Sequence, residues 1–157
     1  MSDEHVTVFA DDSRIEALSA YTDSLEELVA VFSDAAAGDG ALLDRRPAED
    51  AWSVAEVLHH LADVEMAMAV DLRRILAEDR PELTGLDQDA YADATMYAVR
   101  PAADALAVVL ATRNLNTRLL ATLAPEQWTR TGIDPDDGEI DVAHQIEHCR
   151  ERHFRRE

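Results

Sequence analysis

The chain has 157 residues, 47% of them apolar, which is enough for one domain with a hydrophobic core of its own. Its formal net charge is −19 and all 14 basic residues are arginines, so its surface repels phosphate backbones and excludes nucleic acid as an expected partner. The chain has a single cysteine, Cys149, so an intramolecular disulfide is impossible. Because the sequence has no apolar run long enough to span a bilayer and no secretory signal, it predicts a cytoplasmic protein with no membrane partner.

The N-terminal part is expected to contain a short tail and one long helix. Residues 1–13 are acidic and polar and predict a tail, which leaves residues 14–157 as the folded domain. The first helix is expected from about residue 14 to residue 37, because apolar residues recur there at helical spacing. Ser13 and Glu16 have the S-x-x-E spacing of a capping box, and a Gly-Asp-Gly sequence follows the predicted end.

The second helix has the clearest start signal in the chain. Ser53 and Glu56 have the spacing of a capping box, and Trp52 with Val57 supplies the hydrophobic staple around it. Apolar residues then recur at three- and four-residue intervals, which predicts a helix ending near Glu78.

A longer crossover separates the second predicted helix from the third. It covers residues 80–100, and we expect a short helix within it at about residues 87–97. Pro101 suits the first turn of the third helix, because its backbone angle is already helical and its missing N–H costs nothing there. That helix is expected to reach Leu120, with Pro125 closing the segment.

The last part predicts a loop and a fourth helix. Residues 131–139 are rich in Asp, Pro and Gly, which is typical of a loop, and strand signals are nearly absent from the chain. Asp141 is the expected N-cap of a helix that continues to the C-terminus. Four helices with short to medium connections predict an all-α fold, a four-helix bundle with the longer crossover between helices two and three.

Histidines are the residues of most functional interest. His144 and His148 are four residues apart, so one face of the last helix presents both imidazoles, a spacing that suits chelation of a divalent metal. His60 lies on the flank of the buried stripe of the second helix, where a histidine must be hydrogen-bonded or ligated. It is therefore either a buried imidazole satisfied by a carboxylate such as Glu56 or a third metal ligand.

Other chemically capable residues have two interpretations each. Asp63 and Glu65 follow the helix-two histidine and either orient its ring or belong to a solvated face. Cys149 is either a small buried apolar residue or a reactive thiol and soft ligand, and the first is commoner for a lone helical cysteine.

Three segments resemble a known family. Residues 52–65, with the sequence Trp-Ser-Val-Ala-Glu-Val-Leu-His-His-Leu-Ala-Asp-Val-Glu, resemble the second-helix signature of the DinB-like (YfiT-like) proteins. Residues 127–130 and 138–143 resemble the family's later loop and the start of its fourth helix, so the resemblance covers the chain from about residue 14 onward. It implies a four-helix bundle, often dimeric, that binds nickel or zinc through one histidine of helix two and a His-x-x-x-His pair of helix four.

The resemblance assigns the metal ligands unevenly. The helix-two ligand falls on His60, but an ungapped count places the helix-four ligands near Arg152 and Arg156. Arginine cannot ligate a metal, because it is permanently protonated and has no lone pair to offer. A shift of about two turns brings His144 and His148 into the ligand role, so the expected metal site is His60, His144 and His148.

Two functions remain in competition at this point. The resemblance implies a divalent-metal-dependent enzyme, of the thiol transferase or hydrolase type, that activates a low-molecular-weight thiol or water for a small-molecule substrate and forms a homodimer. The alternative is a non-catalytic helical bundle, stress-related or partner-binding, that has lost the metal site. Arg152 and Arg156 favour the alternative, whereas three histidines in spatial contact favour the enzyme.

Overall fold

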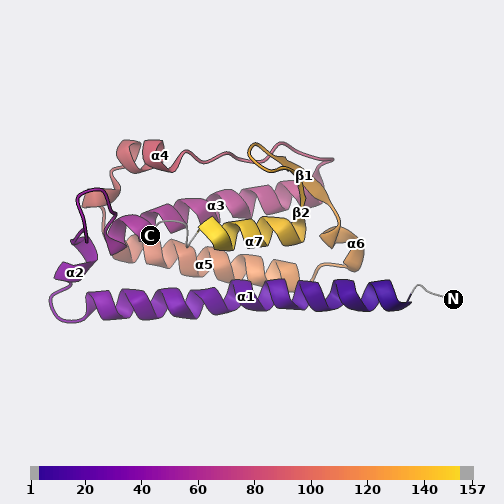
Figure 1. Ribbon diagram of the computed structural model, residues 1–157, viewed down its shortest axis with the longest axis horizontal. Helices are drawn as coiled ribbons and strands as arrows, with labels where there is room; N and C mark the ends of the chain where they lie inside the picture. The colour runs from indigo at the N-terminus through magenta and orange to yellow at the C-terminus, as the bar shows by residue number, and fades with distance from the viewer. Residues whose placement is uncertain (1–3, 153–157) are drawn as a thin grey trace.

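Four helices lie side by side and form the body of the molecule (Figure 1): α1 (Glu4–Ala36), α3 (Val54–Ala77), α5 (Ala102–Ala121) and α7 (Val142–Arg152). This computed structural model describes residues 4–152, with side chains described for residues 14–150. α1 and α3 each pack against both α5 and α7. The predicted four-helix bundle is therefore confirmed, including the longer crossover between the second and third of these helices.

The start of α1 differs from the prediction. The helix already includes Glu4, well before the expected start at Arg14. No glycine or proline interrupts the sequence between these residues, so nothing in it terminates a helix there. Ser13 consequently lies inside α1, and the predicted capping box of Ser13 and Glu16 is wrong. The predicted end is confirmed, because Gly38 follows the helix in the left-handed region, with φ of 81°.

The start of α3 is as predicted. The Ser53 hydroxyl accepts the backbone N–H of Glu56 over 3.2 Å, and the Glu56 carboxylate accepts the backbone N–H of Ser53 over 2.9 Å. Both halves of the capping box are present, so two of the unsatisfied N–H groups at this helix end have partners.

Short helices occupy the connections: α2 (Ala41–Asp44), α4 (Gln88–Ala94), the 3-10 helix η1 (Tyr97–Val99) and α6 (Pro125–Trp128). α4 and η1 confirm the short helix expected in the crossover, and Asp87 caps α4 by accepting the N–H of Ala90 over 3.1 Å. The crossover is attached to α3 by Asp71, whose carboxylate accepts the N–H and the hydroxyl of Thr84, each over 2.9 Å.

The predicted loop before the last helix is a β-hairpin. β1 (Thr131–Asp134) pairs antiparallel with β2 (Gly138–Asp141), and Asp134 lies opposite Gly138 at the turn. Of the Asp, Pro and Gly residues that predicted a loop, only Pro135, Asp136 and Asp137 form the turn, whereas Gly132, Asp134 and Gly138 belong to the paired strands. The crossover adds two hydrogen bonds to β1 at Ile133: the backbone N–H of Leu83 donates to the Ile133 carbonyl, and the N–H of Ile133 donates to the Pro81 carbonyl, each over 2.8 Å. These non-local bonds stabilise strands too short to be predicted from local pattern.

The centre of the bundle contains charge. Glu65 is fully buried and paired with Arg113 of α5, whose Nε donates to the Glu65 carboxylate over 2.8 Å. The hydroxyl of Tyr21 donates to the same carboxylate, also over 2.8 Å. Glu65 therefore connects α1, α3 and α5, and the interpretation that it belongs to a solvated face is wrong. Asp63 accepts a hydrogen bond from the hydroxyl of Tyr97 in the crossover.

Among residues 4–152, no helix combines the length and the apolarity that a bilayer span requires.

Candidate metal centre

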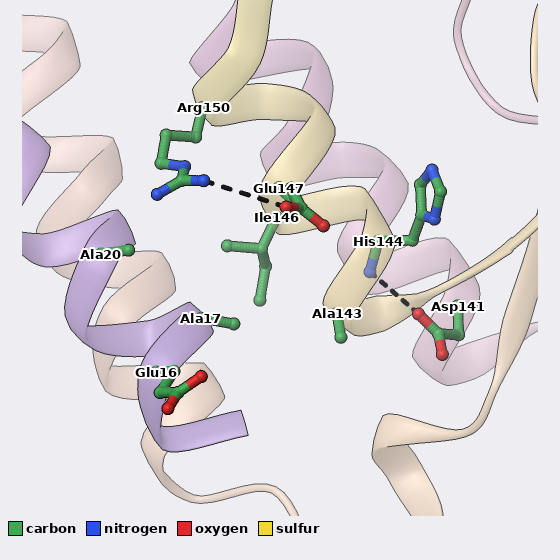
Figure 2. Close-up of a pocket in the computed structure, with 9 residues that line it drawn as sticks. All are labelled: Glu16, Ala17, Ala20, Asp141, Ala143, His144, Ile146, Glu147 and Arg150. Atoms are coloured by element: carbon green, nitrogen blue, oxygen red, sulfur yellow. Dashed lines mark hydrogen bonds and ion pairs between the residues drawn. The ribbon is translucent and has the colours of Figure 1, made fainter. Parts of the chain in front are cut away.

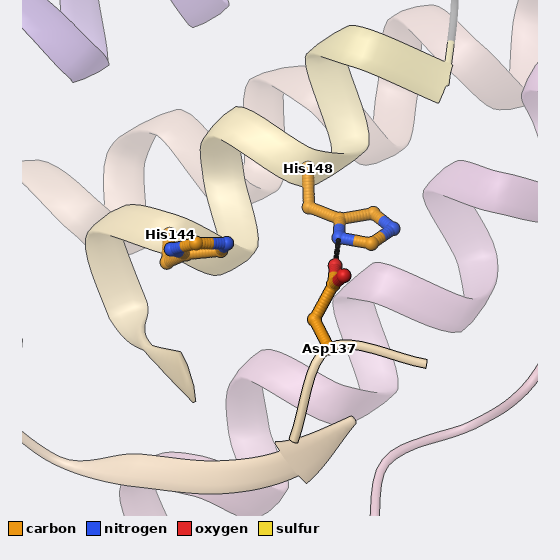
Figure 3. A group of neighbouring side chains, drawn as sticks. All are labelled: Asp137, His144 and His148. Atoms are coloured by element: carbon orange, nitrogen blue, oxygen red, sulfur yellow. Dashed lines mark ion pairs between the residues drawn. The ribbon is translucent and has the colours of Figure 1, made fainter. Parts of the chain in front are cut away.

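The start of α7 fixes the direction of its histidines. The Asp141 carboxylate accepts the backbone N–H of His144 over 2.8 Å, so the predicted N-cap is confirmed. Because the helix begins at Val142, His144 lies in its first turn and His148 one turn further on. Both side chains project toward the β-hairpin (Figure 3).

The third member of the group comes from the hairpin turn. Asp137 lies opposite the two histidines, and one candidate ligand atom from each of Asp137, His144 and His148 lies within 4.8 Å of the other two. The Asp137 carboxylate contacts Nδ1 of His148 over 2.7 Å, which holds the imidazole ring in a fixed orientation.

Asp134 shapes the turn that carries Asp137. Its buried carboxylate accepts the backbone N–H groups of Asp136 and Asp137 over 2.9 and 3.1 Å. Side-chain bonds of this kind to the backbone two and three residues on stabilise a tight turn. The position of Asp137 therefore depends on a bonded turn, not on a freely moving loop.

The chemistry of this group fits a divalent transition metal. It offers two imidazole nitrogens and one carboxylate oxygen, which are ligand types that zinc and nickel accept. Three protein ligands leave coordination positions for water or a substrate. Asp137 and His144 are exposed and His148 is half-buried, so small molecules can reach the group.

An open groove begins beside His144 and runs between α1 and α7 (Figure 2). Its volume is about 480 Å³. Ala17 and Ala20 of α1 face Ala143 and Ile146 of α7 across it. The groove is large enough for a small organic molecule. Of the two histidines only His144 lines it, and the His144 ring points away from α1 (Figure 2).

His60 does not belong to this group. It is buried near the start of α3, and its ring meets the ring of Trp52 edge-on, with 5.4 Å between centroids. The next-door His59 stacks on Tyr97. His148 lines a small cavity with Val64, Ala67 and Met68 of α3, and the first of these is four residues, or about 6 Å, further along that helix than His60.

The structure thus brings His144 and His148 together but places Asp137, and not His60, in the group with them. The use of any of these side chains as metal ligands stays a prediction. Arg152 is the last residue of α7 and its side chain lies outside the described ones, as does the whole of Arg156. Sequence reasoning missed Asp137, because its contact with His148 depends on the hairpin; the one local signal was the acidic Asp-Pro-Asp-Asp-Gly turn before the helix.

Comparison with protein families and known proteins gives one consistent result. The family model described as "DinB superfamily" matches residues 15–151. The chain is similar to a Bacillus subtilis (strain 168) protein named "Putative metal-dependent hydrolase YfiT", with 28% identity over 129 residues that cover 82% of this chain and 69% of that protein. It is also similar to "Putative metal-dependent hydrolase OB0782" of Oceanobacillus iheyensis, with 29% identity over 104 residues, covering 66% of this chain and 60% of that relative's length.

A solved structure supports the same fold. It is described as "YfiT from Bacillus subtilis is a probable metal-dependent hydrolase with an unusual four-helix bundle topology". The TM-score is 0.70 with 23% sequence identity, and the match covers 98% of this chain and 82% of the other. At this identity the likeness establishes the fold alone.

Proposed function

The chain belongs to the DinB superfamily, and we propose that it is a divalent-metal-dependent enzyme of the hydrolase type whose metal ligands are Asp137, His144 and His148. The observation that carries the proposal is the convergence of these three side chains, with one ligand atom of each within 4.8 Å of the others. The names of two similar proteins, which describe metal-dependent hydrolases, support it.

The ion would act as a Lewis acid that lowers the pKa of a nucleophile toward neutrality. The protein itself orients the ligand side chains. The Asp141 cap orients the first turn of α7 and hence the histidine pair, while the turn formed by Asp134 holds Asp137 opposite it. Because these supports are backbone hydrogen bonds, the ligands are arranged before any ion binds.

The nucleophile in this proposal is water, and a low-molecular-weight thiol is the variant that the family resemblance adds. A small-molecule substrate would occupy the groove between α1 and α7, with its reacting end near His144. The cytoplasmic location and the homodimer expected from the sequence remain part of the proposal.

One observation favours the second candidate, a non-catalytic bundle. His60, the position that the family signature assigns to the helix-two ligand, packs against Trp52 and is not in the group with His144 and His148. A protein that kept the fold and lost the chemistry would show this separation.

An activity screen with matched variants separates the two candidates. The tag-free protein is stripped with a chelator, reloaded with Zn²⁺ or Ni²⁺, and offered panels of carboxylic esters, amides and phosphoesters. The proposal predicts hydrolysis that requires the metal and is lost in His144→Ala. A parallel thermal-shift screen with low-molecular-weight thiols tests the thiol variant, since a ligand that binds only the folded state raises the Tm. Loaded protein that is inactive in both screens would favour the non-catalytic bundle.

A further inference from the structure

An apolar pocket lies where α2 packs against α1 and against the start of α3 (Figure 1). Its volume is about 340 Å³, which is within the range of small-molecule sites in proteins. The pocket is separate from the groove between α1 and α7. Ala20 lines that groove and Leu28 lines the pocket, and eight residues of helix place them about 12 Å apart along α1.

The walls of this pocket are almost entirely apolar. Leu58 of α3 is 1% exposed and is the most deeply buried of the lining residues, and the rings of Phe32 and Trp52 line the pocket with it. Val31 and Leu42 also line it, but they are 55% and 49% exposed. Large apolar side chains that remain exposed around a concave surface are typical of a binding site. An apolar ligand in the pocket would cover both.

The pocket has one charged lining residue, Arg45, which directly follows α2 and is exposed. Among residues 14–150, Arg45 has no hydrogen-bond or ion-pair partner. The adjacent Arg46 differs, because its Nε donates to the Glu56 carboxylate over 2.9 Å. The Arg45 guanidinium is therefore available to a ligand, and this group binds carboxylates through two parallel hydrogen bonds.

We propose that the pocket binds a small amphipathic monocarboxylate, with its apolar body between α1 and α3 and its carboxylate on Arg45. One water molecule occupies about 30 Å³ in the liquid and a methylene group is of similar size, so the pocket has room for a body of roughly ten carbon atoms.

The charges favour a single carboxylate over other head groups. Arg45 supplies one positive charge, and the net charge of −19 on the chain repels a doubly charged phosphate more strongly than a singly charged carboxylate. An amine is disfavoured as well, because its positive charge would lie beside the Arg45 guanidinium.

This site does not depend on the proposed hydrolase activity. None of its lining residues belongs to the group of Asp137, His144 and His148 or to the groove beside His144. The two proposals can therefore fail separately, and His144→Ala should bind the carboxylate as the parent protein does.

Calorimetric titration of the full-length protein with octanoate tests the proposal, and octylamine serves as the probe with the same apolar body and the opposite charge. We expect one saturable equivalent of octanoate, a higher Tm in its presence, and an affinity for octylamine that is weaker by about tenfold or more. The affinity for octanoate should also fall as NaCl is added, because salt screens an exposed ion pair.

Matched variants separate the charge from the apolar walls. Arg45→Gln should weaken octanoate binding by roughly threefold to tenfold and remove most of its salt dependence. Arg118→Gln is the control, since it removes the same charge from an exposed position of α5 outside the pocket and should leave the affinity unchanged. Val31→Glu places a carboxylate at the pocket and should weaken binding by about tenfold or more, while glutamate keeps the helix intact.

Three results would overturn the proposal. The first is the absence of saturable octanoate binding by the parent protein at millimolar concentrations. The second is an affinity that is equal for octanoate and octylamine, or equal in the parent, Arg45→Gln and Val31→Glu. The third is a dimer that does not bind octanoate and dissociates in Val31→Glu, which would show that a second copy of the chain covers the pocket.

Discussion

Glu65 of α3 and Arg113 of α5 form an ion pair at the centre of the bundle, with 0% and 1% of their side chains exposed. Arg113 also donates to the Tyr21 backbone carbonyl over 2.6 Å and to the Ser24 hydroxyl over 2.8 Å, and its guanidinium lies 3.9 Å from the centre of the Tyr21 ring. The Cys149 thiol of α7 also donates to the Glu65 carboxylate over 3.7 Å, so all four main helices meet at one charged cluster.

Removal of one partner should be far more damaging than removal of both. Arg113→Met leaves the Glu65 carboxylate buried without its cation, and we expect a loss of about 3–5 kcal/mol in the free energy of unfolding. The double variant with Glu65→Leu removes both charges and should recover much of that loss. Urea unfolding of the parent, the two single variants and the double variant measures this coupling. Additive single effects would contradict the interpretation.

Acid should weaken the capping box of α3. Burial opposes ionisation of Glu56, but hydrogen bonds from Arg46 and Ser53 outweigh it and hold the pKa of Glu56 below its usual 4.5. A carboxylate with a lowered pKa in the folded state stabilises the fold above the unfolded-state pKa, and that contribution disappears as the pH falls through the folded-state pKa.

Glu56→Gln isolates this effect from the other carboxylates. The difference in unfolding free energy between the parent and Glu56→Gln should be largest at neutral pH and should shrink as the pH falls below 4.5. Urea midpoints of both proteins across this range provide the measurement. A difference that stays constant down to strongly acidic pH would show that Glu56 contributes through packing and not through its charge.

The hairpin is fitted tightly against α3 at Gly132. A Cβ atom at this position would lie 2.6 Å from Cδ2 of Leu83 and 3.0 Å from Cγ1 of Ile75, both buried side chains. Gly132→Ala should therefore lower the unfolding free energy by about 1–3 kcal/mol. Gly85→Ala is the matched control, because its nearest new contact is 3.3 Å from Pro135 and should cost less. Equal Tm values for both variants would mean that β1 can move away from α3.

Local signals in the sequence predicted the elements whose ends depend on local bonds. The Ser53 capping box, the Asp141 N-cap and the short crossover helix were all predicted, because each depends on side chains within a few residues of the backbone groups they satisfy. The start of α1 was placed too late, since an S-x-x-E pair inside a helix looks the same as one at its end.

Contacts between residues far apart in the sequence could not be predicted from local patterns. The burial of Glu65 depends on Arg113, which lies 48 positions further along the chain, and no periodic pattern connects the two. The hairpin depends on bonds to the crossover, and the contact of Asp137 with His148 depends on the hairpin. For the candidate site, the four-residue spacing of His144 and His148 predicted that the two imidazoles lie on one helix face. The approach of Asp137 to them could be seen only in the folded structure.

Metal binding by a set of single variants tests the central claim most directly. The tag-free protein, His144→Ala, Asp137→Asn and His60→Gln are stripped, checked for folding by circular dichroism, and titrated with Zn²⁺ and Ni²⁺. We expect one equivalent of metal in the parent protein and in His60→Gln, and an affinity lower by roughly a hundredfold in His144→Ala and Asp137→Asn. No stoichiometric metal in the parent, or a loss in His60→Gln as large as that in His144→Ala, would contradict a metal centre formed by Asp137, His144 and His148.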